Sequence, residues 1–326
     1  MLSDAPLYAD VADAPDGGRA WWLTAEDGVR LRIGAWVPEA AHGTVLLFPG
    51  RTEYVEKYGR AAGDLSARGY ATLVVDWRGQ GLADRLIGDA MSGHVHFFGD
   101  YQRDVRAMLD AARVLDLPRP WHLLAHSMGG CIGLRALHNG LPVASATFSA
   151  PMWGIHMSDI LRPVAWSLSW SSRRIGMDHL YAPGTLPEPY VLTEPFETNR
   201  LTGDRDMYRY MIDQTRAYPA LGLGGPSLRW LNEALKECRA LSRMASPDYP
   251  CLTFLGTDED IVNPTRVRSR MGVWPGAQFE IIDGARHEVL METPDTRRRI
   301  FDRVARFMDA HSGENGTRAR ASAAGS

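Results

Sequence analysis

One segment constrains the fold of this chain more than any other: a short apolar run that ends at a serine and is followed at once by a helix-forming stretch. It reads Trp121-His122-Leu123-Leu124-Ala125-His126-Ser127-Met128-Gly129-Gly130. Small residues stand two positions before and two positions after Ser127, as a sharp and strained strand-to-helix turn requires. Such a turn lifts the hydroxyl clear of the backbone. The segment therefore predicts a buried strand, a nucleophilic Ser127 and a helix from Met128.

Short apolar runs alternate with helix-like segments along much of the chain. Runs of this kind are typical of strands buried on both faces of a parallel sheet. Their alternation with helices predicts an α/β fold with a mostly parallel central sheet flanked by helices. We expect strands at 44–48, 71–75, 144–149, 251–255 and 279–282, after two strands around the turn at Asp27-Gly28. We expect helices at 54–68, from Asp100, from Asn263 and at 293–311.

The alternation stops between residues 151 and 247, where the chain is helix-like and rich in large apolar side chains. We interpret 1–150 and 248–312 as the core and 151–247 as an inserted helical cap. An apolar insertion beside a nucleophile favours an apolar substrate pocket, to which we assign Trp153, Trp166, Trp170 and Trp230. The polar segment 313–326 is typical of a disordered tail.

Composition excludes several classes of function and location. A net charge of −3 is not the charge of a nucleic-acid-binding protein. Three cysteines cannot form a disulfide framework, which favours a reducing compartment, the cytoplasm. The chain begins with no signal peptide and contains no apolar run long enough to cross a bilayer. We therefore expect a soluble protein, at most peripheral at the inner face of the membrane. Nothing in the sequence sets an oligomeric state.

A nucleophilic serine needs a base within hydrogen-bonding reach and an acid that orients the base. In this architecture the three follow in the order nucleophile, acid, base. His287 follows the strand expected at 279–282 and is the predicted base. The loop after 251–255 carries three adjacent carboxylates, Asp258, Glu259 and Asp260. The spacing from Gly256 favours Glu259 as the acid, with Asp258 and Asp260 as alternatives.

Two backbone donors should face the oxyanion that forms during attack. The Met128 N–H is one of them. The turn Pro49-Gly50-Arg51, which follows the strand expected at 44–48, supplies the other through the Arg51 N–H. The sequence predicts neither a metal nor a cofactor, because it has no Cys/His cluster with metal-site spacing and Gly222–Pro226 lacks the features of a phosphate loop.

With these motifs the chain resembles the α/β-hydrolase superfamily, and within it the bacterial PldB-type lysophospholipases and their monoacylglycerol-lipase and serine-aminopeptidase relatives. The similarity is carried by the serine segment, by His287-Glu288 and by Pro49-Gly50-Arg51 with 53–58, 76–81, 93–95, 100–101, 150–155 and 224–226 with Trp230. Ala125 departs from the pattern, because it replaces the first glycine of the serine turn. Pro49 stands where many relatives have histidine.

The resemblance implies a triad of Ser127, Glu259 and His287, with Arg51 and Met128 at the oxyanion hole. It also implies hydrolysis of the acyl ester of a single-chain lipid, first of all a lysophospholipid. Alternative substrates are monoacylglycerols, short-chain esters or the N-terminal residue of a peptide, which carboxylates such as Glu188, Glu194 and Glu197 would hold. A hydrolase fold kept only for binding is the non-enzymatic alternative.

Overall fold

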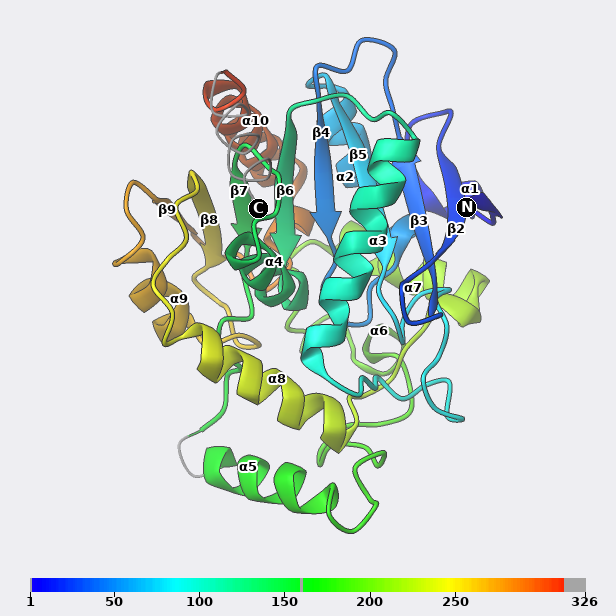
Figure 1. The fold of residues 1–326 in the computed structure, drawn as a ribbon, viewed down its shortest axis with the longest axis vertical. Helices are drawn as coiled ribbons and strands as arrows, with labels where there is room; N and C mark the ends of the chain where they lie inside the picture. Colours follow the sequence, from blue (N-terminus) through cyan, green and yellow to red (C-terminus); the bar gives the residue numbers. More distant parts are fainter. Residues whose placement is uncertain (1, 159–160, 314–326) are drawn as a thin grey trace.

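The computed structural model describes residues 2–158 and 161–313. Its centre is a nine-stranded sheet in the order β1-β2-β3-β5-β4-β6-β7-β8-β9 (Figure 1). The strands are β1 (Ser3–Ala5), β2 (Arg19–Thr24), β3 (Arg30–Trp36), β4 (Gly43–Phe48), β5 (Tyr70–Asp76), β6 (Trp121–His126), β7 (Ala146–Ser149), β8 (Cys251–Gly256) and β9 (Gln278–Ile282). The helices are α1 (Ala9–Ala12), α2 (Gly59–Ser66), α3 (Tyr101–Val114), α4 (Met128–His138), α5 (Leu161–Ser172), α6 (Tyr190–Thr193), α7 (Arg205–Ala217), α8 (Leu228–Leu241), α9 (Pro264–Met271) and α10 (Pro294–Ala310).

The sheet is parallel from β5 through β4 to β9, whereas β1, β2 and β3 run antiparallel at one edge. Every residue of β4, β5, β6, β7 and β8 is buried. Continuous burial explains why apolar residues predominate in these strands. Because parallel strands end at the same edge of a sheet, the loops after β4, β6, β8 and β9 are brought together there.

Helices cover both faces of the sheet. Figure 1 shows α3 and α4 in front of the sheet and α2 and α10 behind it. The apolar sides of α10 and α3 are buried, with Phe301 and Met108 fully inside. This confirms the predicted α/β-hydrolase architecture of a mostly parallel sheet between two layers of helices.

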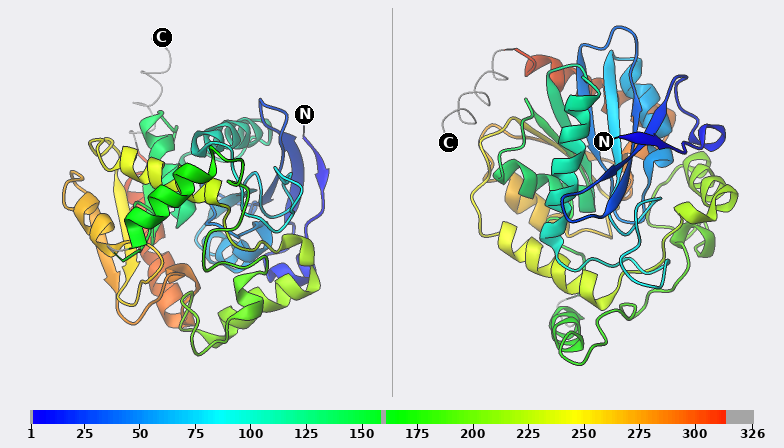
Figure 2. Two further views of the ribbon diagram at one scale, coloured as in Figure 1. Left: turned by 90° about the horizontal axis from the view of Figure 1, so that it is seen from below. Right: turned by 45° about the vertical axis from the view of Figure 1, so that its right-hand side comes forward.

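Between β7 and β8 no strand joins the sheet in the described part of the chain, and α5 to α8 lie there instead. Helices α5 and α8 pack against each other (Figure 2, left). Helix α7 lies beside α1 (Figure 2, right), where the Tyr210 hydroxyl donates a 2.6 Å hydrogen bond to the Ala12 carbonyl. We call residues 151–247 the insertion. Its separation from the core as a domain stays a prediction.

Two local predictions differ from the structure. The helix expected at 54–68 begins as a 3₁₀ turn at Val55–Tyr58 and becomes α-helical only from Gly59, as helix beginnings often do. Elements β1 and α1 were not expected, because three or four residues carry too little periodicity to reveal a strand or a helix. The tail expected at 313–326 lies outside the described residues from 314 onward.

Candidate active site

Ser127 stands in a strained turn between β6 and α4. Its backbone has φ 50° and ψ −117°, a left-handed conformation that non-glycine residues rarely adopt. Gly129 permits this turn, because a Cβ there would lie 2.0 Å from the Phe48 carbonyl oxygen. The methyl group of Ala125 is accommodated in the buried β6 strand. The predicted sharp turn is therefore present despite the missing first glycine.

A continuous chain of hydrogen bonds joins three of the predicted site residues. The Ser127 Oγ lies 2.9 Å from His287 Nε2, and His287 Nδ1 lies 2.8 Å from Glu259 Oε2. An ionised carboxylate only accepts hydrogen bonds, so Nδ1 carries the proton and Nε2 is free to accept one from the serine. These residues follow β6, β9 and β8, whose carboxyl ends meet at this edge of the sheet.

The structure brings Glu259, and not its neighbours, to the histidine. The Glu259 side chain is fully buried, and its Oε1 accepts hydrogen bonds from the N–H groups of Ile261 and Val262. Asp258 and Asp260 are exposed, and Asp260 faces Arg200 at 3.4 Å instead. Among the three carboxylates, the spacing from Gly256 selected the one that reaches the imidazole.

The environment of Glu259 keeps it ionised. Burial by itself raises the pKa of a carboxyl group. Here the attraction and hydrogen bond of the His287 ring, together with the two backbone N–H groups, outweigh burial and lower the pKa of Glu259 below its ordinary value. An ionised Glu259 fixes the His287 ring in the tautomer that can accept the serine proton.

The turn after β4 lies beside Ser127, as predicted for an oxyanion site. Arg51 and Met128 line the same cavity as Ser127. Within the described residues, neither the Arg51 N–H nor the Met128 N–H donates a hydrogen bond to another group. The carboxylate of Glu53 accepts a hydrogen bond from the Gly50 N–H and so holds the turn in place. Both backbone donors are therefore available to a ligand.

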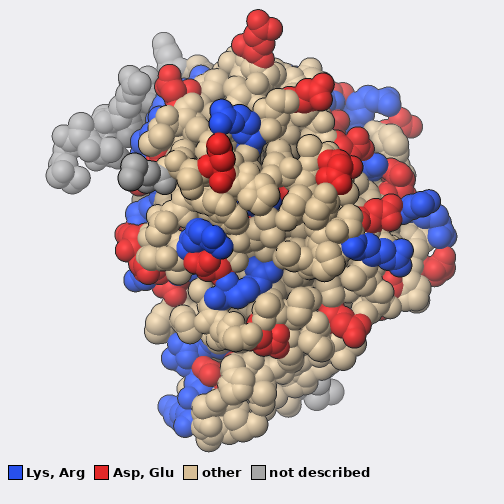
Figure 3. All heavy atoms as spheres, turned by 90° about the vertical axis from the view of Figure 1, so that its right-hand side faces the viewer, with Lys and Arg blue, Asp and Glu red and all other residues tan. Residues whose placement is uncertain are grey.

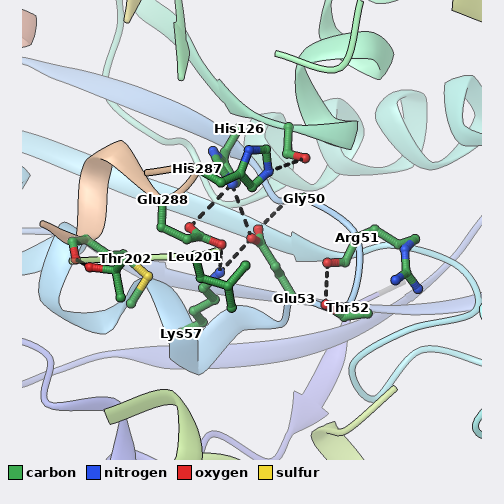
Figure 4. A network of polar contacts seen from close by, with 12 residues as sticks. Gly50, Arg51, Thr52, Glu53, Lys57, His126, Leu201, Thr202, His287 and Glu288 are labelled. Carbon is green, nitrogen blue, oxygen red and sulfur yellow. Dashed lines mark hydrogen bonds and ion pairs between the residues drawn. The ribbon is translucent and has the colours of Figure 1, made fainter. Parts of the chain in front are cut away.

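A buried network of charged side chains lies behind these residues (Figure 4). The Lys57 Nζ lies 2.6 Å from Glu53 Oε1 and 2.6 Å from Glu288 Oε1. The His126 Nε2 lies 3.3 Å from Glu288 Oε2 and 3.6 Å from Glu53 Oε1. The Tyr58 hydroxyl donates a 2.5 Å hydrogen bond to Glu53. We call Glu53, Lys57, His126 and Glu288 the charge network.

The charge network is balanced. Burial acts to lower the pKa of His126, but the carboxylates of Glu288 and Glu53 raise it above its ordinary value. The His126 Nδ1 faces the Ser149 carbonyl oxygen at 3.1 Å, and its Nε2 is directed towards the two carboxylates. Two basic side chains, Lys57 and His126, then face two carboxylates. Such an arrangement removes the cost of leaving a buried charge unpaired.

Three members of the charge network also form the one His/Cys/Asp/Glu group in residues 2–158 and 161–313 whose ligand atoms lie close enough together to hold a metal ion. These are Glu53, His126 and Glu288, all buried. The Lys57 ammonium lies between the two carboxylates and takes the place that a cation would occupy. As arranged, the donor set does not fit a metal ion.

Ser127 and His287 open into a cavity of about 710 Å³, within the range of small-molecule sites. The insertion supplies most of its lining. The apolar part of the wall includes Met152, Ile155, Leu201, Met211, Leu223 and Trp230. The insertion is also tied to the loop of His287, because the N–H groups of His287 and Glu288 donate to the carbonyl oxygens of Arg200 and Leu201.

The structure places one of the four tryptophans assigned to the pocket in the wall of the cavity at Ser127. Trp230 lines the cavity. Trp153 is buried against Phe148 and lines a separate depression with Trp166. Trp170 is 51% exposed on α5. Of the described side chains, these three do not line the cavity at Ser127. Apolar composition indicates burial or contact with an apolar surface, but it does not say which wall a side chain joins.

No sequence motif predicts the charge network. Its members are the chain neighbours of recognised residues: His126 precedes Ser127, and Glu288 follows His287. Glu53 and Lys57 are four residues apart just after the oxyanion turn, a spacing at which side chains in a helical turn meet. These positions and this spacing can be seen in the sequence. They do not predict that four side chains from three segments meet in one buried site.

Comparison with known proteins agrees with this geometry. A family model described as "Serine aminopeptidase, S33" (Hydrolase_4) matches residues 39–294. The chain is 30% identical over 308 residues to "Lysophospholipase L2" of Escherichia coli, covering 91% of this chain and 89% of that protein. It is 29% identical over 278 residues to "Probable lysophospholipase L2" of Haemophilus influenzae, covering 84% and 87%.

Among solved structures, a soluble variant of monoglyceride lipase from Saccharomyces cerevisiae matches with a TM-score of 0.70 and 19% identity, over 90% of this chain and 95% of that one. At that identity the likeness shows the fold alone. The family model spans most of the chain, and its span includes Ser127, Glu259 and His287. The chain therefore belongs to the serine aminopeptidase S33 family of α/β-hydrolases.

Proposed function

We propose that this protein hydrolyses the acyl ester of a single-chain lipid, and that its substrate is a lysophospholipid. One observation carries the proposal: the hydrogen-bonded chain Ser127–His287–Glu259 opens into a largely apolar cavity of about 710 Å³. A single acyl chain is the kind of ligand that such a wall would bury. Relatives named as lysophospholipases, at about 30% identity over most of the chain, support the same substrate class.

In the proposed mechanism the Ser127 Oγ attacks the ester carbonyl carbon while its proton passes to His287 Nε2. Glu259 holds the Nδ1–H and stabilises the imidazolium. The negative charge on the carbonyl oxygen is met by the N–H groups of Arg51 and Met128. His287 then gives its proton to the departing glycerol oxygen, which leaves an acyl-Ser127.

A water molecule completes the reaction. It transfers a proton to His287 as it attacks the acyl-enzyme, and the fatty acid leaves when Ser127 regains that proton. No metal or cofactor takes part in this proposal. The insertion serves as a cap over the acyl chain, since it supplies most of the cavity wall and is bonded to the His287 loop.

The proposal includes contact between the insertion and a membrane surface. Large apolar side chains are exposed on and just after α5: Val164, Leu168, Trp170, Ile175, Met177 and Leu180. In Figure 3 the lowest part of the molecule, where α5 lies, is mostly uncharged, with basic and a few acidic side chains at its edge. Such a surface suits the boundary of anionic lipid. No helix in the described part of the chain is long and apolar enough to span a membrane.

The three cysteines are buried and free, which supports a cytoplasmic location, at the inner face of the membrane. Sedimentation with vesicles containing anionic lipid tests the contact. We expect V164S/W170S to reduce the fraction of protein that sediments with the vesicles. A fraction equal to that of wild type would contradict the proposed contact of α5 with the membrane.

A panel of purified substrates tests the function itself: lysophosphatidylcholine, monoolein, p-nitrophenyl butyrate and proline-naphthylamide. We expect the highest kcat/KM with lysophosphatidylcholine. Glu194 lines the cavity and is the carboxylate that an aminopeptidase could use to hold a free amine. A kcat/KM highest for proline-naphthylamide, or no turnover of any ester, would overturn the proposal.

A further inference from the structure

The side chain of Arg51 is a cation in the cavity without a counter-charge. Arg51 lines the cavity together with Ser127. Its Nη1 donates a 2.9 Å hydrogen bond to the Gly224 carbonyl oxygen, and its Cζ lies 5.6 Å from the centroid of the Trp230 ring. Figure 4 shows the side chain directed away from Glu53 and Lys57. Among the described residues, no carboxylate lies within ion-pair distance of it.

The other cations of the cavity wall are paired. Lys57 lies between Glu53 and Glu288, and Arg200 faces Asp260 at 3.4 Å. Removal from water without a counter-charge lowers the pKa of Arg51 to about 10, so the guanidinium still carries its proton at neutral pH. A guanidinium has five N–H donors, and within residues 2–158 and 161–313 the Gly224 carbonyl oxygen is the one acceptor that this guanidinium meets. The remaining donors are available to an anionic ligand.

The position of Arg51 relates the cation to the reacting ester. Its backbone N–H is one of the proposed oxyanion donors, and its guanidinium lies at the other end of the same residue. In Arg51, a short chain of covalent bonds joins the backbone nitrogen to the guanidinium carbon. In a lysophospholipid, a chain of about the same number of bonds joins the ester carbonyl carbon to phosphorus. A substrate whose headgroup extends along the Arg51 side chain, with its carbonyl oxygen at the backbone donor, would bring its phosphate to the guanidinium.

We propose that the Arg51 guanidinium binds the headgroup phosphate of the lysophospholipid. The planar fork of a guanidinium matches two phosphate oxygens. The loop carrying Gly224 and the ring of Trp230 hold the fork in place before substrate arrives. This inference rests on the proposed function and adds the group by which a lysophospholipid is distinguished from a neutral monoacylglycerol.

Two substrates with the same acyl chain test the inference: 1-oleoyl-lysophosphatidylcholine and 1-monoolein. The readout is the ratio of their kcat/KM values, because the ratio cancels any change at the oxyanion site that both esters share. We expect R51Q to lower the ratio by about 10- to 100-fold, the value of a charge-assisted hydrogen-bonded contact. R51K keeps the positive charge but lacks the planar guanidinium. Its ratio should lie between those of wild type and R51Q.

R229Q is the matched control. Arg229 lies next to Trp230 on α8 but pairs with Asp178 at 2.9 Å, so its loss should leave the ratio unchanged. Thermal unfolding of each variant checks that it is folded. A ratio for R51Q equal to that of wild type overturns the inference. If inorganic phosphate then inhibits monoolein hydrolysis by wild type and not by R51Q, the guanidinium binds free phosphate instead of a headgroup.

A different result would overturn the proposed function itself. Wild-type protein that cleaves neither lipid would overturn the function, and the inference with it. Wild-type protein that cleaves both lipids, with R51Q lowering both rates by the same factor, would retain the function and overturn the headgroup assignment alone.

Discussion

Glu288 and His126 lie with Oε2 and Nε2 3.3 Å apart, and each is the immediate chain neighbour of a residue in the Ser127–His287 pair. This contact ties the end of β6 to the loop after β9. Through Lys57 and Glu53 it continues to the Gly50 N–H in the oxyanion turn. The three segments that carry the proposed reacting groups thus share one buried set of charged side chains, which fixes their relative positions.

Lys57→Met should destabilise the protein strongly. The change leaves the carboxylates of Glu53 and Glu288 buried without the cation between them. Breaking a buried pair in this way costs about 3–5 kcal/mol. Lys236, the other lysine of the chain, is 42% exposed and pairs with Glu233 at 2.8 Å. Urea unfolding should show a loss below about 1 kcal/mol for Lys236→Met. Equal losses for the two variants would show that the charge network contributes little.

Glu259→Gln should lower kcat by about 10³- to 10⁴-fold, because the amide cannot hold the imidazole in its working tautomer. Asp258→Asn and Asp260→Asn serve as controls, since both side chains are exposed and do not contact His287. Their kcat values should stay within about threefold of wild type. Near-normal turnover by Glu259→Gln would refute the assignment of the acid.

Ser127→Gly should be more stable than Ser127→Ala. Both variants lack the nucleophile, but only glycine adopts φ 50° without strain. Backbone strain of this kind costs on the order of 1–3 kcal/mol, and the greater freedom of unfolded glycine offsets part of the gain. We expect a net difference of about 1 kcal/mol in urea unfolding. An alanine variant as stable as the glycine variant would mean that the turn stores no strain.

Acid should destabilise the protein through buried neutral histidines. Burial lowers the pKa of His122 to about 4 and that of His94 to about 4. Between that value and the ordinary 6.5, the unfolded chain binds protons that the folded chain does not. Stability therefore falls as the pH is lowered from about 6.5 to about 4, by up to about 3 kcal/mol per histidine.

His122→Asn isolates one of these contributions. The variant removes the titrating ring and keeps a polar partner for Ser145, which His122 Nδ1 meets at 2.8 Å. Unfolding free energies measured from pH 7 to pH 4 should fall less steeply for His122→Asn than for wild type. Parallel curves would contradict a buried neutral His122.

Much of the sheet could be predicted from the sequence because its strands are buried on both faces. Strands β4, β5, β6 and β8 are short apolar runs bounded by polar or turn residues, and burial forces that pattern. The serine turn was also predictable, since its geometry excludes large side chains at fixed positions. Glu259 could be selected by its spacing from Gly256.

Features set by contacts between distant segments could not be predicted. The charge network joins residues up to 231 positions apart, and no local pattern records that Lys57 meets Glu288. The tryptophans of the insertion look alike in the sequence but lie in different surroundings. Helix α5 packs against α8 and not over Ser127. Elements β1 and α1 depend on pairing with β2 and on contact with α7.

Turnover of lysophosphatidylcholine by purified Ser127→Ala, measured beside wild type, tests the central claim most directly. The account predicts that kcat falls by about 10⁵- to 10⁶-fold, because removal of the nucleophile disables His287 and Glu259 with it. Turnover by Ser127→Ala within tenfold of wild type would contradict the account.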